Sequence, residues 1–377
     1  MASIRTRVLF VLPTHKFDIF IQGLVRNSSN DFEFSAILFD GNFNKEPTSG
    51  LHGYQKTYSL GNLTPKSLIK NTIRCRRIIK TTNPDIVHVT AYFSAIVVMI
   101  SVWTLRRKPK ILWNRHYNKG HHNFRSKIHV RMDKLLTSSS DATIVISHAQ
   151  FETMVYAERS DPLKIQVINN GIDLELLKLS SEGRQYFRTI FRGKDGLVLL
   201  AVGRLHAEKD YLTLFTALVL LQQKGHKFHL FIAGDGDPKY IEFLHDRVAE
   251  LNLTHLITFL GWVDEIHSAM LECDLFVQAS LDEAFGLSIL EASVLGISVA
   301  STTPGGVVEM ISEFHPFVAP RDSLTLAEIM AAKAVESTEK RKYISEKMLE
   351  RFPISKMAEK YNIVYEKLNA RLKVDEK

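Results

Sequence analysis

The stretch DLFVQASLDEAFGLSILEASVLGISVAST, residues 274–302, decides the fold. It begins with an apolar strand that ends at Ser280, passes through a short acidic loop to Gly286, and enters a helix that closes at Gly296. A second apolar strand, ISVAST at 297–302, follows at once. A strand, a helix and a strand in this order predict a parallel sheet covered by helices.

The same alternation of predicted strands and helices continues toward both ends of the chain. Short apolar, β-branched runs alternate with longer amphipathic segments, as in α/β proteins. Two sheets, one in each half of the chain, are therefore predicted. The expected strands are 7–13, 34–40, 85–90, 110–114, 142–147 and 164–170 in the first half, and 196–204, 227–236, 256–261, 274–280 and 297–302 in the second.

Two helical segments of the first half carry specific expectations. Residues 66–80 predict an amphipathic helix that ends before Asn83-Pro84, as a proline stop requires. Residues 91–105 form an uncharged run that is shorter than the roughly 20 residues of a spanning helix, so a buried helix is predicted there. The apolar stripe of the first helix is expected to consist of Leu68, Ile69, Ile73 and Ile78/Ile79.

The length of 377 residues exceeds what one hydrophobic core usually organises, so two domains are expected. Residues 1–170 are interpreted as an N-terminal α/β domain. Residues 171–194 lack strand character and are interpreted as the linker. Residues 195–360 are interpreted as a second α/β domain, and residues 361–377 as a C-terminal helix that packs back on the first domain.

Charge is shared unevenly between the halves. Residues 1–170 hold 24 Lys and Arg against 11 Asp and Glu, whereas residues 171–377 hold 24 against 30. The basic half is expected to face an anionic surface or substrate, and a solvated basic face without a partner is the alternative. Because Arg106, Arg107, Lys108 and Lys110 directly follow the run 91–105, a role at a membrane surface is a hypothesis for this region.

The two cysteines and the N-terminus bear on the compartment. Cys75 and Cys273 have no spacing that suits a disulfide framework or a zinc site, which favours a reducing compartment. The apolar run at 8–12 is short and no cleavage site follows it, so it is interpreted as a first strand and not as a signal peptide. A cytoplasmic protein, peripheral at the inner face of the membrane, is expected.

The loop within 274–302 carries the first candidate residues. Glu283 lies in the loop beyond the carboxyl end of a strand, where open α/β sheets bind ligands. Gly286 precedes a helix start, whose amide groups suit phosphate or sugar oxygens. Glu291 lies about one turn inside the helix, where its carboxylate can accept hydrogen bonds from the vicinal hydroxyls of a ribose. Two solvated surface carboxylates are the alternative.

Glu283 and Glu291, separated by seven residues around AFGLSIL, resemble the signature of the GT-B retaining glycosyltransferases of family 4. The resemblance implies two Rossmann-like domains facing a central cleft, with residues 1–170 on the acceptor side and residues 195–360 binding the nucleotide sugar. It also implies transfer of a sugar from a nucleoside diphosphate to an acceptor hydroxyl. It implies that Glu283, with the backbone of Phe285, Gly286 and Leu287, holds the donor sugar while Glu291 holds the ribose. No cofactor is expected beyond the nucleotide-sugar substrate.

Other segments carry the same resemblance. GLVLLAVGR followed by LHAEKDY places Arg204 and Lys209 where the family grips the donor diphosphate, and fixed cations would stabilise the charge of the departing group. FIAGDGDP, with Gly234, resembles the loop that lies against the nucleotide. The aspartates at 235 and 237 permit a metal interpretation. A metal-free site is preferred because the two cations already supply positive charge.

The first half resembles the family less closely. WNRHYNK makes His116 the candidate that stabilises the developing oxocarbenium or hydrogen-bonds the sugar, and a structural histidine is the alternative. A metal site of His116, His121 and His122 is disfavoured because no diagnostic spacing accompanies them. Many family members have a glycine-rich loop after the first strand, whereas this chain has Pro13-Thr14-His15-Lys16, so His15 or Lys16 would have to replace that contact.

The predicted function is therefore sugar transfer in the assembly of cell-surface polysaccharide, lipopolysaccharide or glycolipid. The expected partners are a nucleotide-sugar donor, a saccharide or lipid-linked acceptor and an anionic membrane surface, but no nucleic acid. A nucleotide-sugar epimerase of the same fold, an inactive relative that only binds partners, and a nucleic-acid-binding protein that uses the basic half are the alternatives. The last lacks a recognised motif or an ordered aromatic platform.

Overall fold

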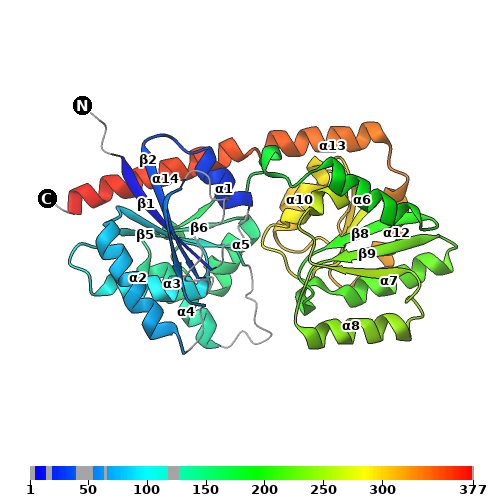
Figure 1. Cartoon of the computed structure of the whole chain (residues 1–377), viewed down its shortest axis with the longest axis horizontal. Helices are drawn as coiled ribbons and strands as arrows, with labels where there is room; N and C mark the ends of the chain where they lie inside the picture. Colours follow the sequence, from blue (N-terminus) through cyan, green and yellow to red (C-terminus); the bar gives the residue numbers. More distant parts are fainter. Residues whose placement is uncertain (1–4, 14–18, 40–53, 63–65, 118–126, 376–377) are drawn as a thin grey trace. The chain divides into compact units, whose positions relative to one another are not determined.

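The computed structural model describes residues 5–13, 19–39, 54–62, 66–117 and 127–375. The chain divides into two compact units, which are drawn in Figure 1. The first unit comprises the chain up to Asp173 together with Phe352–Lys377, and the second comprises Leu174–Arg351. Each unit contains one parallel sheet with helices on both faces, which confirms the predicted α/β class.

The first unit is built on a parallel sheet of seven strands in the order β3-β2-β1-β4-β5-β6-β7. Six of them coincide with the predicted strands to within three residues at either end. The seventh, β3, was not predicted because its sequence YQKTYSL is polar, as an edge strand with a single neighbour allows. The strands are β1 (Thr6–Leu12), β2 (Phe32–Phe39), β3 (Tyr54–Leu60), β4 (Ile86–Val89), β5 (Lys110–Arg115), β6 (Ala142–Val145) and β7 (Ile165–Val167).

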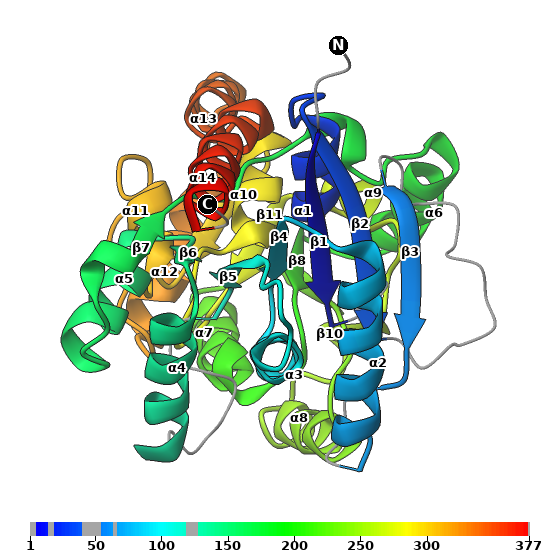
Figure 2. The ribbon, with the colours of Figure 1, turned by 90° about the vertical axis from the view of Figure 1, so that its left-hand side faces the viewer.

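Helices cover both faces of this sheet. Figure 2 shows α1 and α14 above the strands and α2, α3 and α4 below them, and the buried residues form one core on each face. Tyr361 and Tyr365 of α14 are fully buried in the upper core. The helices are α1 (Ile19–Arg26), α2 (Leu68–Thr82), α3 (Tyr92–Trp103), α4 (Lys127–Ser139), α5 (His148–Glu152) and α14 (Ile354–Asp375), with short π and 3-10 turns at Thr153–Ala157 and Pro162–Lys164.

The helix α2 ends where the sequence predicts, but it turns a different face to the core. Asn83 closes it in the left-handed conformation, directly before Pro84. The expected apolar stripe is wrong in part, since Ile69 and Ile73 are 76% and 56% exposed, whereas Ile79 is buried as expected. At about 100° per residue these two lie on the side opposite Cys75, the centre of the buried face. The buried residues of α2 are Asn71, Cys75 and Ile79.

The predicted buried helix at 91–105 is α3, and it is buried on one side only. Its inner side packs into the lower core through residues such as Ala95 and Val98. Its outer side exposes Phe93, Ile100 and Trp103, the last at 77%. Among the helices of the described residues, none is long and apolar enough to span a membrane.

The second unit is built on a parallel sheet of five strands in the order β10-β9-β8-β11-β12. All five were predicted, and this order is the one found in nucleotide-binding doubly wound sheets. The stretch 274–302 forms β11, α10 and β12, the βαβ unit expected of it. The strands are β8 (Leu197–Val202), β9 (Phe228–Ala233), β10 (Ile257–Gly261), β11 (Leu275–Gln278) and β12 (Ser298–Ser301).

The helices of the second unit follow its strands. Apolar residues of α7, α8 and α12 pack with the sheet into one core, whose members include Phe215, Leu244 and Leu326. The helices are α6 (Ser181–Arg192), α7 (Tyr211–Gln223), α8 (Pro238–Glu250), α9 (Ile266–Met270), α10 (Leu287–Val294), α11 (Gly306–Ile311), α12 (Ser323–Ala334) and α13 (Thr338–Arg351), with 3-10 turns at Leu174–Leu176 and Ala207–Lys209.

The boundaries between the units differ from the expected ones. The segment 171–194, expected to be a linker, contains α6, whose Phe187 and Phe191 are buried in the second unit. The chain returns to the first unit at Phe352, nine residues before the expected C-terminal segment 361–377. A linker was expected because serines and a glycine cluster there, but Ser180 is the N-cap of α6 and accepts from the amide of Gly183.

Candidate active site

The strand order of the second sheet creates a topological switch point between β8 and β11. From β8 the chain continues to β9 and β10 on one side, whereas β11 and β12 lie on the other. Open α/β sheets bind ligands at such a point, beyond the carboxyl ends of the strands. The loops that follow β8 and β11 contain three of the predicted site residues, Arg204, Lys209 and Glu283.

Lys209 and Glu283 meet at this switch point. Lys209 ends the 3-10 turn after β8, Glu283 lies in the loop after β11, and the lysine Nζ forms an ion pair with Glu283 Oε1. Their side chains are only 23% and 14% exposed, so salt screens this pair less than a surface pair. The structure thus brings together two residues that lie 74 positions apart in the sequence.

Polar side chains from β11 and α10 hold the carboxylate of Glu283 in place. Gln278 Nε2 and Ser280 Oγ donate to the same Oε1 at 2.8 and 2.9 Å, and Ser288 Oγ donates to Gln278 Oε1 at 3.0 Å. No hydrogen bond from the described residues reaches Oε2, which leaves that oxygen able to accept from a ligand. These three supporting residues were not among the predicted site residues.

Arg204 extends the positive charge of the site. It follows β8 by two residues, and its side chain is 49% exposed. The guanidinium Nη2 lies 3.7 Å from Glu208 Oε2, beyond hydrogen-bonding distance. A guanidinium presents five N–H donors in a planar fork, a geometry that suits the oxygens of a diphosphate.

Gly234 follows β9 and allows two backbone segments to meet. Its φ of 149° is rare for residues with a side chain, and a Cβ there would lie 1.8 Å from the carbonyl oxygen of Gly203. The amide of Gly203 in turn donates to the carbonyl of Ala233 at 3.0 Å. This close approach requires glycine at 234 whether or not a donor is bound, so the predicted nucleotide contact of Gly234 stays a prediction.

The N-terminus of α10 lies beside Glu283. Gly286 caps the helix in the left-handed conformation, with φ 92° and ψ 55°, and a Cβ there would lie 3.0 Å from Val307. The preceding Phe285 is fully buried and anchors the loop. Leu287 begins the helix, whose first amide groups have no carbonyl partner within the helix and carry partial positive charge.

Glu291 faces a buried histidine that the sequence analysis did not single out. Its Oε2 lies 3.5 Å from Nε2 of His267, which belongs to α9. The amide of Lys178 donates to the histidine Nδ1 at 2.9 Å, so Nδ1 is the acceptor and the ring proton sits on Nε2, toward the glutamate. The Glu291 side chain is 17% exposed, so it remains accessible to a ligand.

His116 lies in the first unit, at the carboxyl end of β5. Its ring packs edge-on against Phe20 with 4.9 Å between centroids, and its Nε2 has no hydrogen-bond partner among the described residues. Burial lowers the pKa of His116 to about 4, so the imidazole is neutral at physiological pH. Burial, with a smaller contribution from His116, lowers the pKa of the neighbouring His88 to about 3.

The backbone around His116 is held by a buried polar network. The Arg115 guanidinium forms a bidentate pair with Glu158 at 2.6 and 2.8 Å, and neither side chain is exposed. Gln150 Nε2 donates to the carbonyl oxygens of Arg115 and Tyr117, the two residues on either side of the histidine. The position of His116 is therefore fixed by side chains that are themselves fully engaged.

In the described part of the chain, no group of three His, Cys, Asp or Glu side chains could hold a metal ion. His121 and His122 lie outside the described residues, as do His15 and Lys16. Asp237 is the N-cap of α8 and accepts from the amides of Lys239 and Tyr240. This capping role explains the aspartate without a metal.

Two family models match the chain in the order of its units. The model of glycosyltransferase family 4 matches residues 30–176, and the model of glycosyl transferases group 1 matches residues 184–351. The first segment lies almost wholly in the first unit and the second segment in the second unit. Together they span most of the 377 residues.

Two curated relatives match about half of the chain. An uncharacterized glycosyltransferase of Methanocaldococcus jannaschii is 30% identical over 185 residues, which is 48% of this chain and 47% of the relative. The GPI3 subunit of phosphatidylinositol N-acetylglucosaminyltransferase from Saccharomyces cerevisiae is 28% identical over 197 residues, 50% of this chain and 42% of the relative. The matched region thus spans less than half the length of either relative.

Solved structures show the same fold. The HepE protein of Anabaena, solved with UDP and glucose, has a TM-score of 0.80 over 96% of this chain and 100% of its own, at 21% identity. At this identity the likeness shows the fold alone, which is GT-B with two Rossmann-like domains. With both family models matching in order on this fold, the chain belongs to the GT-B glycosyltransferases of family 4.

Proposed function

We propose that the protein transfers a sugar from a nucleoside diphosphate to an acceptor hydroxyl with retention of the anomeric configuration. The observation that carries the proposal is the junction of Lys209 and Glu283 at the switch point of the second unit, with Arg204 on the same loop as the lysine. A pair of cations beside an ordered carboxylate suits a ligand that combines phosphates with hydroxyls. Family membership supports the same reaction.

The cations would bind the diphosphate. When the bond between the anomeric carbon and the phosphate oxygen breaks, negative charge gathers on the departing nucleoside diphosphate. The Lys209 ammonium has three donors and gives one to Glu283, so two remain for phosphate oxygens. The first amides of α10 would add partial positive charge, and the site would need no metal ion.

The carboxylates would bind the hydroxyls of the donor. Glu283 Oε2, which accepts no hydrogen bond from the described residues, would accept from a hydroxyl of the sugar. Glu291, whose Oε2 lies 3.5 Å from His267 Nε2, would accept from the ribose. Because structural neighbours from Anabaena were solved with UDP and with UDP-glucose, a uridine nucleotide is the first donor to test.

The first unit would supply the acceptor side. Neutral His116 can hydrogen-bond a sugar without adding positive charge next to a developing oxocarbenium. A relative from yeast is a subunit of a phosphatidylinositol N-acetylglucosaminyltransferase, and a structural neighbour is a lipopolysaccharide outer core galactosyltransferase. These names support an acceptor in lipopolysaccharide or glycolipid assembly, and a cell-surface polysaccharide acceptor at the inner face of a membrane stays part of the proposal.

The test is donor turnover by the full chain with UDP-, GDP-, ADP- and dTDP-sugars, read as release of the nucleoside diphosphate. We expect turnover with one class of nucleotide and a loss of about 100- to 1000-fold in Glu283→Gln, since an oriented charge at the reacting sugar is removed. NMR of the product should show the anomeric configuration of the donor.

Glu250→Gln is the matched control, because Glu250 pairs with Arg247 on the exposed surface of α8. It should turn over donor at the wild-type rate. Wild-type turnover by Glu283→Gln would refute the assignment of the site. An epimerised nucleotide sugar, with the nucleotide still attached, would refute the transfer reaction.

A further inference from the structure

A cavity of about 840 Å³ opens at the edge of the first sheet where the strands begin. Lys110 and Ile111, which start β5, line it, together with the end of α3 and the end of α4. Its size falls within the range of ligand-binding pockets. The apolar side chains in its wall include Met99, Ile100, Val102, Trp103, Leu135 and Leu372.

The cavity is separate from the proposed catalytic residues of the same unit. Lys110 begins β5 and His116 follows its last residue, so the two lie at opposite ends of one strand, roughly 20 Å apart. Ligands of open α/β sheets bind at the carboxyl ends of the strands, the end at which His116 lies. A ligand in the cavity would therefore occupy a second site.

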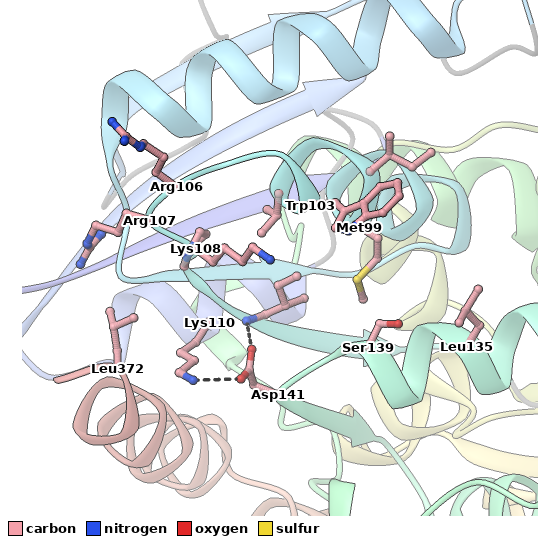
Figure 3. A pocket seen from close by; sticks show the side chains of 14 residues that line it. Met99, Trp103, Arg106, Arg107, Lys108, Lys110, Leu135, Ser139, Asp141 and Leu372 are labelled. Carbon is pink, nitrogen blue, oxygen red and sulfur yellow. Dashed lines mark hydrogen bonds and ion pairs between the residues drawn. The ribbon is translucent and has the colours of Figure 1, made fainter. Parts of the chain in front are cut away.

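The charge of the cavity is positive. Arg106 and Lys108 are exposed and form no ion pair with any described residue. The carboxylate in the wall, Asp141, is already engaged by Lys110 Nζ at 3.2 Å and by the amide of Ile111 at 2.8 Å. Figure 3 shows these two contacts as dashed lines and Lys108 extending toward the middle of the cavity.

The rim of the cavity is apolar and open to solvent. Trp103 is 77% exposed, and Ile100 and Leu135 are about half exposed. The adjacent helix α2 carries Ile69 and Ile73 on its outer face, and Arg76 of α2 donates to Thr104 just after α3. An exposed tryptophan beside arginine and lysine is typical of the boundary between water and a lipid bilayer.

We propose that this cavity and its rim bind an anionic bilayer surface, with a lipid phosphate held by Arg106 and Lys108. Trp103 and Ile100 lie among the lipid headgroups, and the apolar wall receives part of an acyl chain. The surplus of positive charge in the first 170 residues acts in the same direction. This binding keeps the carboxyl ends of the sheet free for substrates.

The experiment is flotation of the full chain with vesicles of phosphatidylcholine alone and of phosphatidylcholine with 30% phosphatidylglycerol. We expect binding to the anionic vesicles only, weakened by added salt. Arg106→Glu with Lys108→Glu should weaken it by at least about thirtyfold, because each basic residue near an anionic surface contributes roughly fivefold and the introduced glutamates add repulsion. Trp103→Ala should weaken it by roughly tenfold.

The second unit supplies matched controls. Arg192→Glu with Lys194→Glu reverses the same residue types at the same spacing, also exposed and without ion pairs among the described residues. Trp262→Ala removes a tryptophan that is 57% exposed. Both controls should bind anionic vesicles like the wild type, and circular dichroism should show all variants folded.

Three results would overturn the proposal. They are equal binding to neutral and anionic vesicles, absence of binding to either, and equal loss in the test pair and the control pair. A Trp103→Ala variant that changes the sedimentation of the protein and leaves vesicle binding intact would identify the rim as an interface between two copies instead. None of these results bears on donor turnover, so the proposed function is tested separately.

Discussion

The two sheets share their central strand order but differ in the chemistry beyond their strands. In the second unit, the loops at the switch point hold Arg204, Lys209 and Glu283, whose side chains remain partly exposed. In the first unit, the residues at the end of β5 are buried. Arg115 forms a buried bidentate ion pair with Glu158. Burial lowers the pKa of His116 beside it, so the imidazole is neutral.

The difference in exposure separates charges that can exchange partners with a ligand from charges that hold the structure in place. Partly exposed charges can exchange their protein partners for the oxygens of an ionic ligand, which suits a diphosphate. Buried and fully paired charges cannot, because an unpaired charge in the interior is strongly unfavourable. The buried pair of the first unit therefore holds the backbone in position, and we propose that the ion pair of the second unit takes part in binding the ligand.

Substituting one glutamate in each unit gives the largest contrast. Glu158→Gln removes the bidentate partner of the buried Arg115 and leaves the longer contact with Asp133, 3.7 Å from Nη2, so we expect a loss of about 2–4 kcal/mol in the free energy of unfolding. Glu283→Gln, at a partly exposed pair, should change it by about 1 kcal/mol or less. Urea denaturation followed by circular dichroism measures both.

If Glu283→Gln were the more destabilising of the two, the contrast drawn between the two units would be wrong. It would mean that the ion pair at the switch point holds the fold together. Donor turnover measured on the same preparations separates the roles further, since only the second variant should lose turnover while remaining folded in buffer.

A smaller effect is expected at His116. Its pKa of about 4 lies below the ordinary value, so the neutral form is present at pH 5 and above and is lost only as the pH falls through about 4. The ratio of kcat between wild type and His116→Gln should therefore be constant from about pH 5 to pH 8, at about tenfold for one lost hydrogen bond. If this ratio instead fell as the pH was lowered, with a midpoint near pH 6.5, His116 would have the pKa of an ordinary histidine.

The fold could be predicted from the sequence because the strands are apolar, short and separated by helical segments. The residues of 274–302 alone specify a strand, a loop, a helix and a strand, and the structure has each of them. The polar edge strand β3 has no such pattern. The outward face of α2 was not predicted, because isoleucines in an amphipathic segment are expected to be buried. In the structure, Ile69 and Ile73 are exposed.

The candidate site could be predicted in part. Lys209 and Glu283 were placed by resemblance, and the structure joins them. Gln278 and Ser280 carry a signal that could have been used, since both are polar residues at the carboxyl end of a buried strand. His267 carries no such signal, because only the packing of α9 against α10 brings it to Glu291.

The central claim is that the charged loops of the second unit bind a nucleoside diphosphate. Calorimetric titration of UDP into the wild type, Lys209→Ala and Lys227→Ala tests it most directly. Lys227 is the matched control because it also pairs with a carboxylate, Asp195, on the open surface. We expect Lys209→Ala to raise the Kd by about tenfold or more and Lys227→Ala to leave it unchanged. Equal affinity in all three proteins would contradict the account.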